Sequence, residues 1–188
     1  MKITRYITRF PVTLSVVSAL IVAIGLTQAS LAQDKAAKAQ ARIGVYDSRS
    51  IAVAFSGSPV HEKQLQQLMA EHKKAKEAGE VDKVAKLEAE GKARQEKAHM
   101  QAFSTAPVDD LLLYITNALP EIQKDAGVTM IISKWDKAGL QQHAGAETVD
   151  VTMKLVDAFQ PTERQRKSAI EIQKHKPIPL EQAKNIKD

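Results

Sequence analysis

The residues of this chain that could perform chemistry are few and far apart. The chain contains no cysteine, and its five histidines lack the close spacing with carboxylates that a metal site requires. We therefore interpret all five as solvated surface residues. They are His61, His72, His99, His143 and His175. The sequence predicts neither a metal ion nor a cofactor.

Three acidic residues and one aromatic residue are the remaining candidates for an active site. Asp109 and Asp110 are adjacent, and adjacent helix positions face different directions, so we interpret them as first-turn carboxylates that stabilise a helix. Asp47 follows an apolar segment but has no partner motif, which favours a turn-forming aspartate. Trp135, the only tryptophan, is interpreted as a packing residue. We therefore expect a protein that is not an enzyme.

The N-terminus has the pattern of a cleavable secretory signal peptide. Three basic residues precede an apolar run over residues 12–26, and the small-residue signal Ser30-Leu31-Ala32 follows. The alternative is an uncleaved anchor, which needs about 20 apolar residues. We expect residues 1–32 to be removed and the chain to reach the periplasm. With no cysteine for lipid attachment, we expect no anchor, whether or not the protein works near a membrane surface.

The charge balance argues against a nucleic-acid partner. Residues 34–160 carry 17 basic and 18 acidic residues, whereas residues 161–188 carry 7 and 4. A nucleic-acid-binding protein needs a basic face on its folded part. We therefore interpret residues 161–188 as a basic C-terminal tail, solvated or available for interactions.

The middle of the chain can form helices but cannot bury itself. Residues 60–102 contain 17 charged residues and no aromatic residue, with narrow apolar stripes at helical spacing. Gly79 can end one helix and Asp82 can cap the next, so residues 59–102 are predicted to form an antiparallel helical hairpin. One continuous helix is the alternative, because a single glycine costs only about 1 kcal/mol there.

The flanks of this hairpin are predicted to form a small body, residues 43–58 and 103–160, after a mobile leader, residues 33–42. Strands are expected at 43–47 and 128–132, with a short third strand around 139–142. An amphipathic helix runs from Leu111 to Ile122, where Pro120 should kink or break it, and Gly127 ends it. Asp150 is expected to cap a last body helix that ends before Pro161.

Over about residues 43–160, the chain resembles the Skp (OmpH-like) family of periplasmic chaperones. The resemblance lies in IGVYD at 43–47, the charged hairpin, ITNAL at 115–119 leading into AGVTMII at 126–132, and TVDVT at 148–152. It implies an α+β fold in which a small β-sheet body is interrupted by a projecting helical hairpin. It also implies a homotrimer whose hairpins enclose unfolded outer-membrane proteins without ATP.

The resulting hypothesis is an exported holding chaperone for unfolded outer-membrane or envelope proteins. Client contacts are expected at Leu65, Leu68, Met69 and Leu87 of the hairpin. Contacts within the trimer are expected from the strands, at Ile43, Val45, Val128, Met130 and Ile132. The alternative is a non-enzymatic envelope adaptor or structural protein that docks a folded partner through the hairpins or the basic tail.

Overall fold

The computed structural model of the chain describes residues 42–186. The predicted signal peptide and all but the last residue of the predicted leader lie outside these residues. Helices hold 66% of the described part, and the strands in it are short. In the described range, no helix has the length and apolarity needed to span a membrane.

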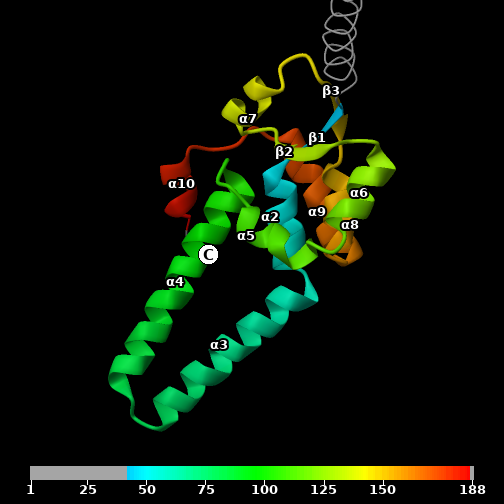
Figure 1. The fold of residues 1–188 in the computed structure, drawn as a ribbon. Helices are drawn as coiled ribbons and strands as arrows, with labels where there is room; N and C mark the ends of the chain where they lie inside the picture. The colour runs from blue at the N-terminus through cyan, green and yellow to red at the C-terminus, as the bar shows by residue number, and fades with distance from the viewer. Residues whose placement is uncertain (1–41, 187–188) are drawn as a thin grey trace, which may run out of the picture. The chain divides into compact units, whose positions relative to one another are not determined.

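Three strands form a parallel sheet in which the first strand lies in the middle (Figure 1). They are β1 (Arg42–Tyr46), β2 (Met130–Ser133) and β3 (Glu147–Asp150). Val45 lies opposite both Ile132 and Asp150. Because parallel neighbours cannot be joined by a tight hairpin, each connection to the next strand passes through helices.

The third strand lies at Glu147–Asp150, so its predicted position at 139–142 is wrong. Those residues belong instead to the short helix α7 (Lys137–Gln142). The carboxylate of Asp136 accepts a hydrogen bond from Gly139 N at 2.9 Å, which caps the start of this helix. A well-capped helical turn therefore forms at the position where the strand was predicted.

A helix that the sequence interpretation missed lies at the centre of the body. It is α2 (Ser48–Ser56), a range in which no helix was expected. Its residues Ile51 and Ala54 are fully buried, and α4, α8 and α9 pack against it. Because it has neighbours on several sides, polar residues of this helix are buried along with the apolar ones, unlike those of a surface helix.

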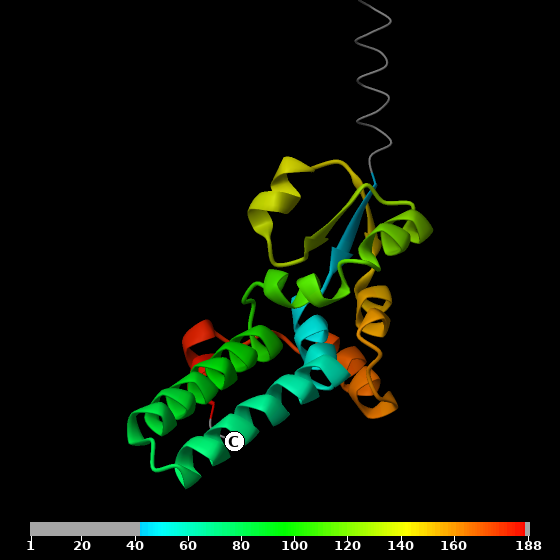
Figure 2. The same cartoon turned by 60° about the horizontal axis from the view of Figure 1, so that its bottom comes forward.

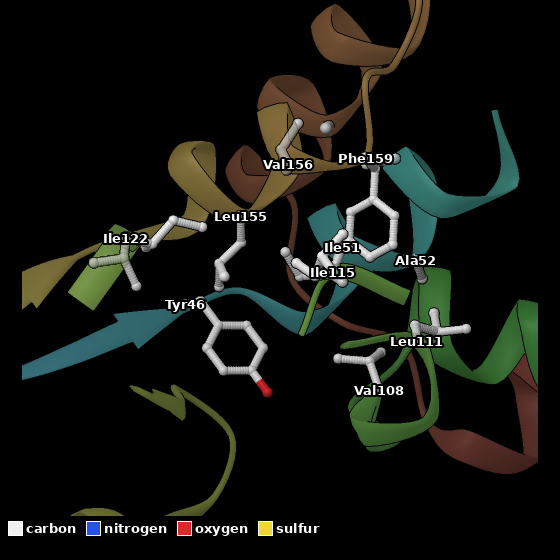
Figure 3. Packing of buried hydrophobic residues seen from close by; sticks show 13 residues of the cluster. Tyr46, Ile51, Ala52, Val108, Leu111, Ile115, Ile122, Leu155, Val156 and Phe159 are labelled. Carbon is white, nitrogen blue, oxygen red and sulfur yellow. The ribbon is translucent and has the colours of Figure 1, made fainter. Parts of the chain in front are cut away.

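Helices on either side of α2 complete the apolar core, which Figure 3 shows from close by. They include α5 (Asp109–Leu112), η1 (Leu113–Ile115), α6 (Leu119–Ala126) and α8 (Thr152–Ala158). Leu111, Ile115, Ile122, Leu155 and Phe159 contribute the larger side chains. The predicted helix over 111–122 is interrupted as expected, with Pro120 in the first turn of α6 and Gly127 at its end.

Two long helices extend from this body and meet at a turn (Figures 1 and 2). They are α3 (Pro59–Glu77) and α4 (Val81–Phe103), called here the α3–α4 pair. The hydroxyl of Ser58 accepts a hydrogen bond from His61 N at 3.2 Å and caps α3. Gly79, at φ 69°, lies in the turn, so the segment is two helices rather than one.

The C-terminal segment, residues 161–186, packs against the body and α4. It contains α9 (Glu163–Glu171), η2 (Ile172–Lys174) and α10 (Leu180–Lys184). Ala169 of α9 and Ala183 of α10 are fully buried. The segment is therefore part of the folded unit, where the sequence interpretation expected a solvated tail.

The predicted fold class, a small β-sheet body interrupted by an OmpH/Skp-like hairpin, is wrong. The body is helical, and its core is centred on α2, while the sheet is a small parallel one. Two errors account for this. No helix was expected over residues 48–56, and the segment 161–186 was left out of the body, although both supply core helices.

Candidate functional site

An apolar groove lies on the α3–α4 pair, towards the turn. Its cavity measures about 510 Å³ and is open to solvent. Leu68, Met69 and Leu87 provide the larger apolar side chains, and the polar side chains of His72 and Glu88 border it. Met69 is 63% exposed, whereas Leu87 is 8% exposed and forms part of the contact between the two helices. The groove thus combines a buried leucine, Leu87, with the exposed thioether of Met69.

A small number of contacts between the two helices maintains this groove. A Cβ atom at Gly91 of α4 would lie 3.8 Å from Leu68 Cδ2, an ordinary contact distance, so α3 and α4 lie close to each other at this point. His72 Nε2 lies 3.1 Å from Glu88 Oε1 and links α3 to α4. Ala75, one turn further along α3, is fully buried. Small residues and one polar link therefore hold the pair together around the groove.

Three of the four predicted client-contact residues lie together in this groove. They are Leu68, Met69 and Leu87, which come from both helices. Leu65 is exposed on α3 but is not part of the lining. The structure thus brings together three apolar side chains that the sequence could only place on separate helices. Whether they touch a client stays a prediction.

The five residues predicted to contact other subunits differ in their availability. Ile43 and Val128 are buried within the chain. Val45, Met130 and Ile132 are half-buried, and the last two belong to an edge strand of the sheet. The trimer stays a prediction.

A second cluster of polar side chains is buried where the strands end. Asp47 and Arg49 are each 1% exposed and form a bidentate ion pair, with Nε to Oδ1 at 3.1 Å and Nη2 to Oδ2 at 2.7 Å. Arg49 N also donates to Asp47 Oδ1 at 3.1 Å. Asp47 is therefore the N-cap of α2, where the sequence interpretation favoured a turn.

Residues that follow β2 complete this cluster. Lys134 Nζ lies 2.6 Å from Asp47 Oδ2, and Trp135 Nε1 donates to Asp47 Oδ1 at 3.3 Å. The Trp135 ring also lies beside two cations, 4.7 Å from Lys134 Nζ and 5.2 Å from the guanidinium carbon of Arg49. Trp135 is thus a packing residue with a polar role.

The electrostatics of this cluster favour an ionised, fully engaged Asp47. Burial acts to raise the pKa of Asp47, but hydrogen bonds and charge from Arg49 and Lys134 outweigh it and lower the pKa below its usual value. Both carboxylate oxygens already accept bonds, and the group is inaccessible to solvent. A general base needs a free oxygen within reach of substrate, so Asp47 is suited to a structural role.

The pKa of a neighbouring tyrosine is shifted in the opposite direction. Burial raises the pKa of Tyr46 to about 12, with smaller contributions from Asp109 and Asp136. Tyr46 is therefore neutral throughout the physiological range. Asp109 and Asp110 lie in the first turn of α5, as predicted, and Asp110 accepts a hydrogen bond from Gln101 at 2.8 Å.

The sequence interpretation missed Arg49 and Lys134 as structural residues. The available signal for Arg49 was that it is the single charged residue of the segment Ser48–Ser56. The histidines also differ from expectation at one position. His99 is 8% exposed and packs beside the Phe103 ring at 5.9 Å, so it is not a solvated surface residue.

Within residues 42–186, no group of three or more histidine, aspartate or glutamate side chains is arranged to hold a metal ion. Comparison of the chain with family models, with curated proteins and with solved structures finds no match.

Proposed function

We propose that this protein is an exported, non-enzymatic holding chaperone that binds apolar segments of unfolded outer-membrane or envelope proteins without ATP. The observation that carries the proposal is the open apolar groove of the α3–α4 pair, lined by Leu68, Met69 and Leu87. Export rests on the signal-peptide pattern of residues 1–32. The proposal does not depend on the family fold.

The groove suits weak and sequence-tolerant binding. A cavity of about 510 Å³ accommodates apolar side chains of different shapes, and the flexible Met69 can adapt to each. Burying one large apolar side chain contributes about 1.5–3 kcal/mol, which is too little to hold a client alone. We therefore propose that several copies, as in the expected trimer, hold one unfolded chain through several weak contacts.

The test compares one groove residue with an exposed residue outside the groove. An unfolded outer-membrane β-barrel is diluted from urea, and its aggregation is followed by light scattering with an excess of the chain from Gln33 onward. Met69→Gln is the groove variant, and Val81→Gln is the matched control, because Val81 is 76% exposed and does not line the groove.

We expect suppression of aggregation by the unmodified chain and by Val81→Gln. Met69→Gln should need about tenfold more protein for the same effect, equivalent to about 1.4 kcal/mol. If the unmodified chain fails to suppress aggregation, the chaperone proposal is wrong. If both variants behave alike, the groove is not the client site.

An adaptor that docks a folded partner through the basic tail has less support. Residues Ala169 and Ala183 of the C-terminal segment are buried, and the backbone around Ile178 is bonded to α4. A partner would therefore have to dock on the exposed side of a folded segment, because this segment is not a free extension. We therefore keep the adaptor as the second hypothesis, with docking through the α3–α4 pair.

A further inference from the structure

The C-terminal segment contacts the body end of each helix in the α3–α4 pair. At the start of α3, Gln165 of α9 lies against Gly57, where a Cβ atom would come within 1.9 Å of the Gln165 side chain. The Gln165 side chain is itself held in place, because its Oε1 accepts a hydrogen bond from Thr162 N at 3.1 Å. The turn between α2 and α3 therefore rests against a fixed side chain.

At the end of α4, the contact is made through backbone and side-chain hydrogen bonds. Ser104 Oγ donates to the carbonyl oxygen of Ile178 at 2.6 Å, and Ile178 N donates to the carbonyl oxygen of Phe103 at 3.0 Å. The helix α10 follows and packs on α4 with Ala183 fully buried (Figure 1). The last turn of α4 is therefore bonded to the C-terminal segment.

Between these two contacts, the segment is attached to the buried ion pair. Arg49 Nη1 donates to the carbonyl oxygen of His175 at 2.8 Å. The other side of the same guanidinium is held by both oxygens of Asp47. A fully buried cation thus fixes the backbone at the point where the segment leaves the body for α4.

We infer that the C-terminal segment is an internal brace that sets the separation and orientation of α3 and α4 where they leave the body. Its α9 end positions the start of α3, its α10 end positions the end of α4, and Arg49 anchors the backbone between them. This inference concerns the position of the helices and holds whether or not the groove binds unfolded proteins.

The test measures the distance between α3 and α4 in solution. Because the chain has no cysteine, spin labels can be placed at two introduced cysteines, Lys63→Cys on α3 and Ala93→Cys on α4, which are both exposed. Double electron–electron resonance then gives the distribution of distances. The samples are the chain from Gln33 onward, the same chain ending at His175, Ala183→Glu and Lys184→Glu.

The two substitutions are matched because they place the same residue at neighbouring positions of α10. Ala183 is fully buried against α4, so glutamate there should detach α10, whereas Lys184 is exposed. The body should remain folded in both, because α4 also packs on α2. Circular dichroism checks the helical content of each sample.

We expect one narrow distance distribution for the unmodified chain and for Lys184→Glu. The shortened chain and Ala183→Glu should give distributions about twofold wider, because α4 loses its contact with α10 and keeps only its packing on α2 at that end. Equal widths for Ala183→Glu and Lys184→Glu would overturn the inference. Should the shortened chain fail to fold, the comparison of the two substitutions decides alone.

Discussion

At the scale of single residues, the buried Asp47 makes an unusual number of bonds. Removing two opposite charges from water costs several kcal/mol per ion, so a buried pair is retained only when its remaining bonds are satisfied. Asp47 accepts from three groups of Arg49, from Trp135 and from Lys134. These partners come from α2 and from the end of β2, so the carboxylate joins the sheet to the helical core.

Removing the charge of Asp47 should therefore strongly destabilise the protein. Asp47→Asn leaves Arg49 buried without a compensating charge, and we expect the free energy of unfolding at pH 7 to fall by about 3–5 kcal/mol. Urea unfolding followed by circular dichroism measures this loss. Asp157→Asn is the control, because Asp157 also pairs with an arginine, Arg166, but at the surface.

The two substitutions should differ in size and in pH dependence. The pKa of Asp47 is lowered in the folded state, so its stabilising contribution is present above the ordinary value of 3.8 and is lost as the pH falls through the folded value. The penalty of Asp47→Asn should therefore shrink below about pH 4. A small effect at pH 7, similar to that of Asp157→Asn, would contradict the role given to Asp47.

This cluster also shows what the sequence could and could not predict at the residue scale. The apolar positions Leu68 and Met69 follow from helical spacing, which is a local property. Arg49 is a local partner of Asp47, two residues further along the chain, whereas Lys134 and Trp135 become partners only when the strand order places the ends of β1 and β2 side by side. Nothing in the spacing of Lys134 and Trp135 along the chain reports that contact.

At the scale of elements, the same difference separates surface helices from buried ones. The sequence predicted α3 and α4 because each has a single apolar stripe and clear end signals, such as Ser58 with Pro59. It missed α2 because that helix is short and packs on several sides, so that its polar residues Ser48, Arg49 and Ser50 are buried with its apolar ones. The periodicity of apolar residues detects helices that pack through one face, and it fails for a helix in the middle of a core.

Two glycines of the α3–α4 pair should respond to alanine in opposite directions. Gly91 lies inside α4, where a Cβ atom would only touch Leu68 at 3.8 Å, so Gly91→Ala should stabilise the protein by about 1 kcal/mol. Gly79 has φ 69°, a conformation that costs alanine about 1–2 kcal/mol, so Gly79→Ala should destabilise it.

Thermal unfolding of the two alanine variants beside the unmodified chain measures both effects. A steric clash does not account for the expected loss of stability in Gly79→Ala, because nothing lies within 4 Å of a Cβ atom built at Gly79. The conformation of the backbone is thus the variable being tested. A stabilising effect of Gly79→Ala would mean that the turn between α3 and α4 differs from the one described.

At the scale of the whole described unit, residues distant in sequence determine the body. The three strands come from three separate parts of the chain, and the C-terminal segment returns to contact both α2 and α4. The sequence interpretation assigned the segment to a solvated tail because it is charged and contains several prolines. Its buried residues, Ala169 and Ala183, are small and isolated, so they leave no apolar pattern to detect.

The distribution of buried side chains predicts uneven stability across this unit. In α2, most residues are buried, whereas Ala75 is the one fully buried residue of α3. Local opening is easiest where few apolar contacts are lost, so amides of α3 should exchange with solvent before those of α2. Hydrogen exchange followed by mass spectrometry should show exchange at least about tenfold faster in α3, equivalent to about 1.4 kcal/mol.

Gly91→Ala provides the internal control for this exchange experiment. It adds a helix-favouring residue and one contact with Leu68, so it should slow exchange in α3 and α4 and leave α2 nearly unchanged. That outcome would mean that the pair opens separately from the core. Equal protection of α3 and α2 would instead mean that the α3–α4 pair and the body unfold as one unit. The small number of buried contacts between α3 and α4 argues against that outcome.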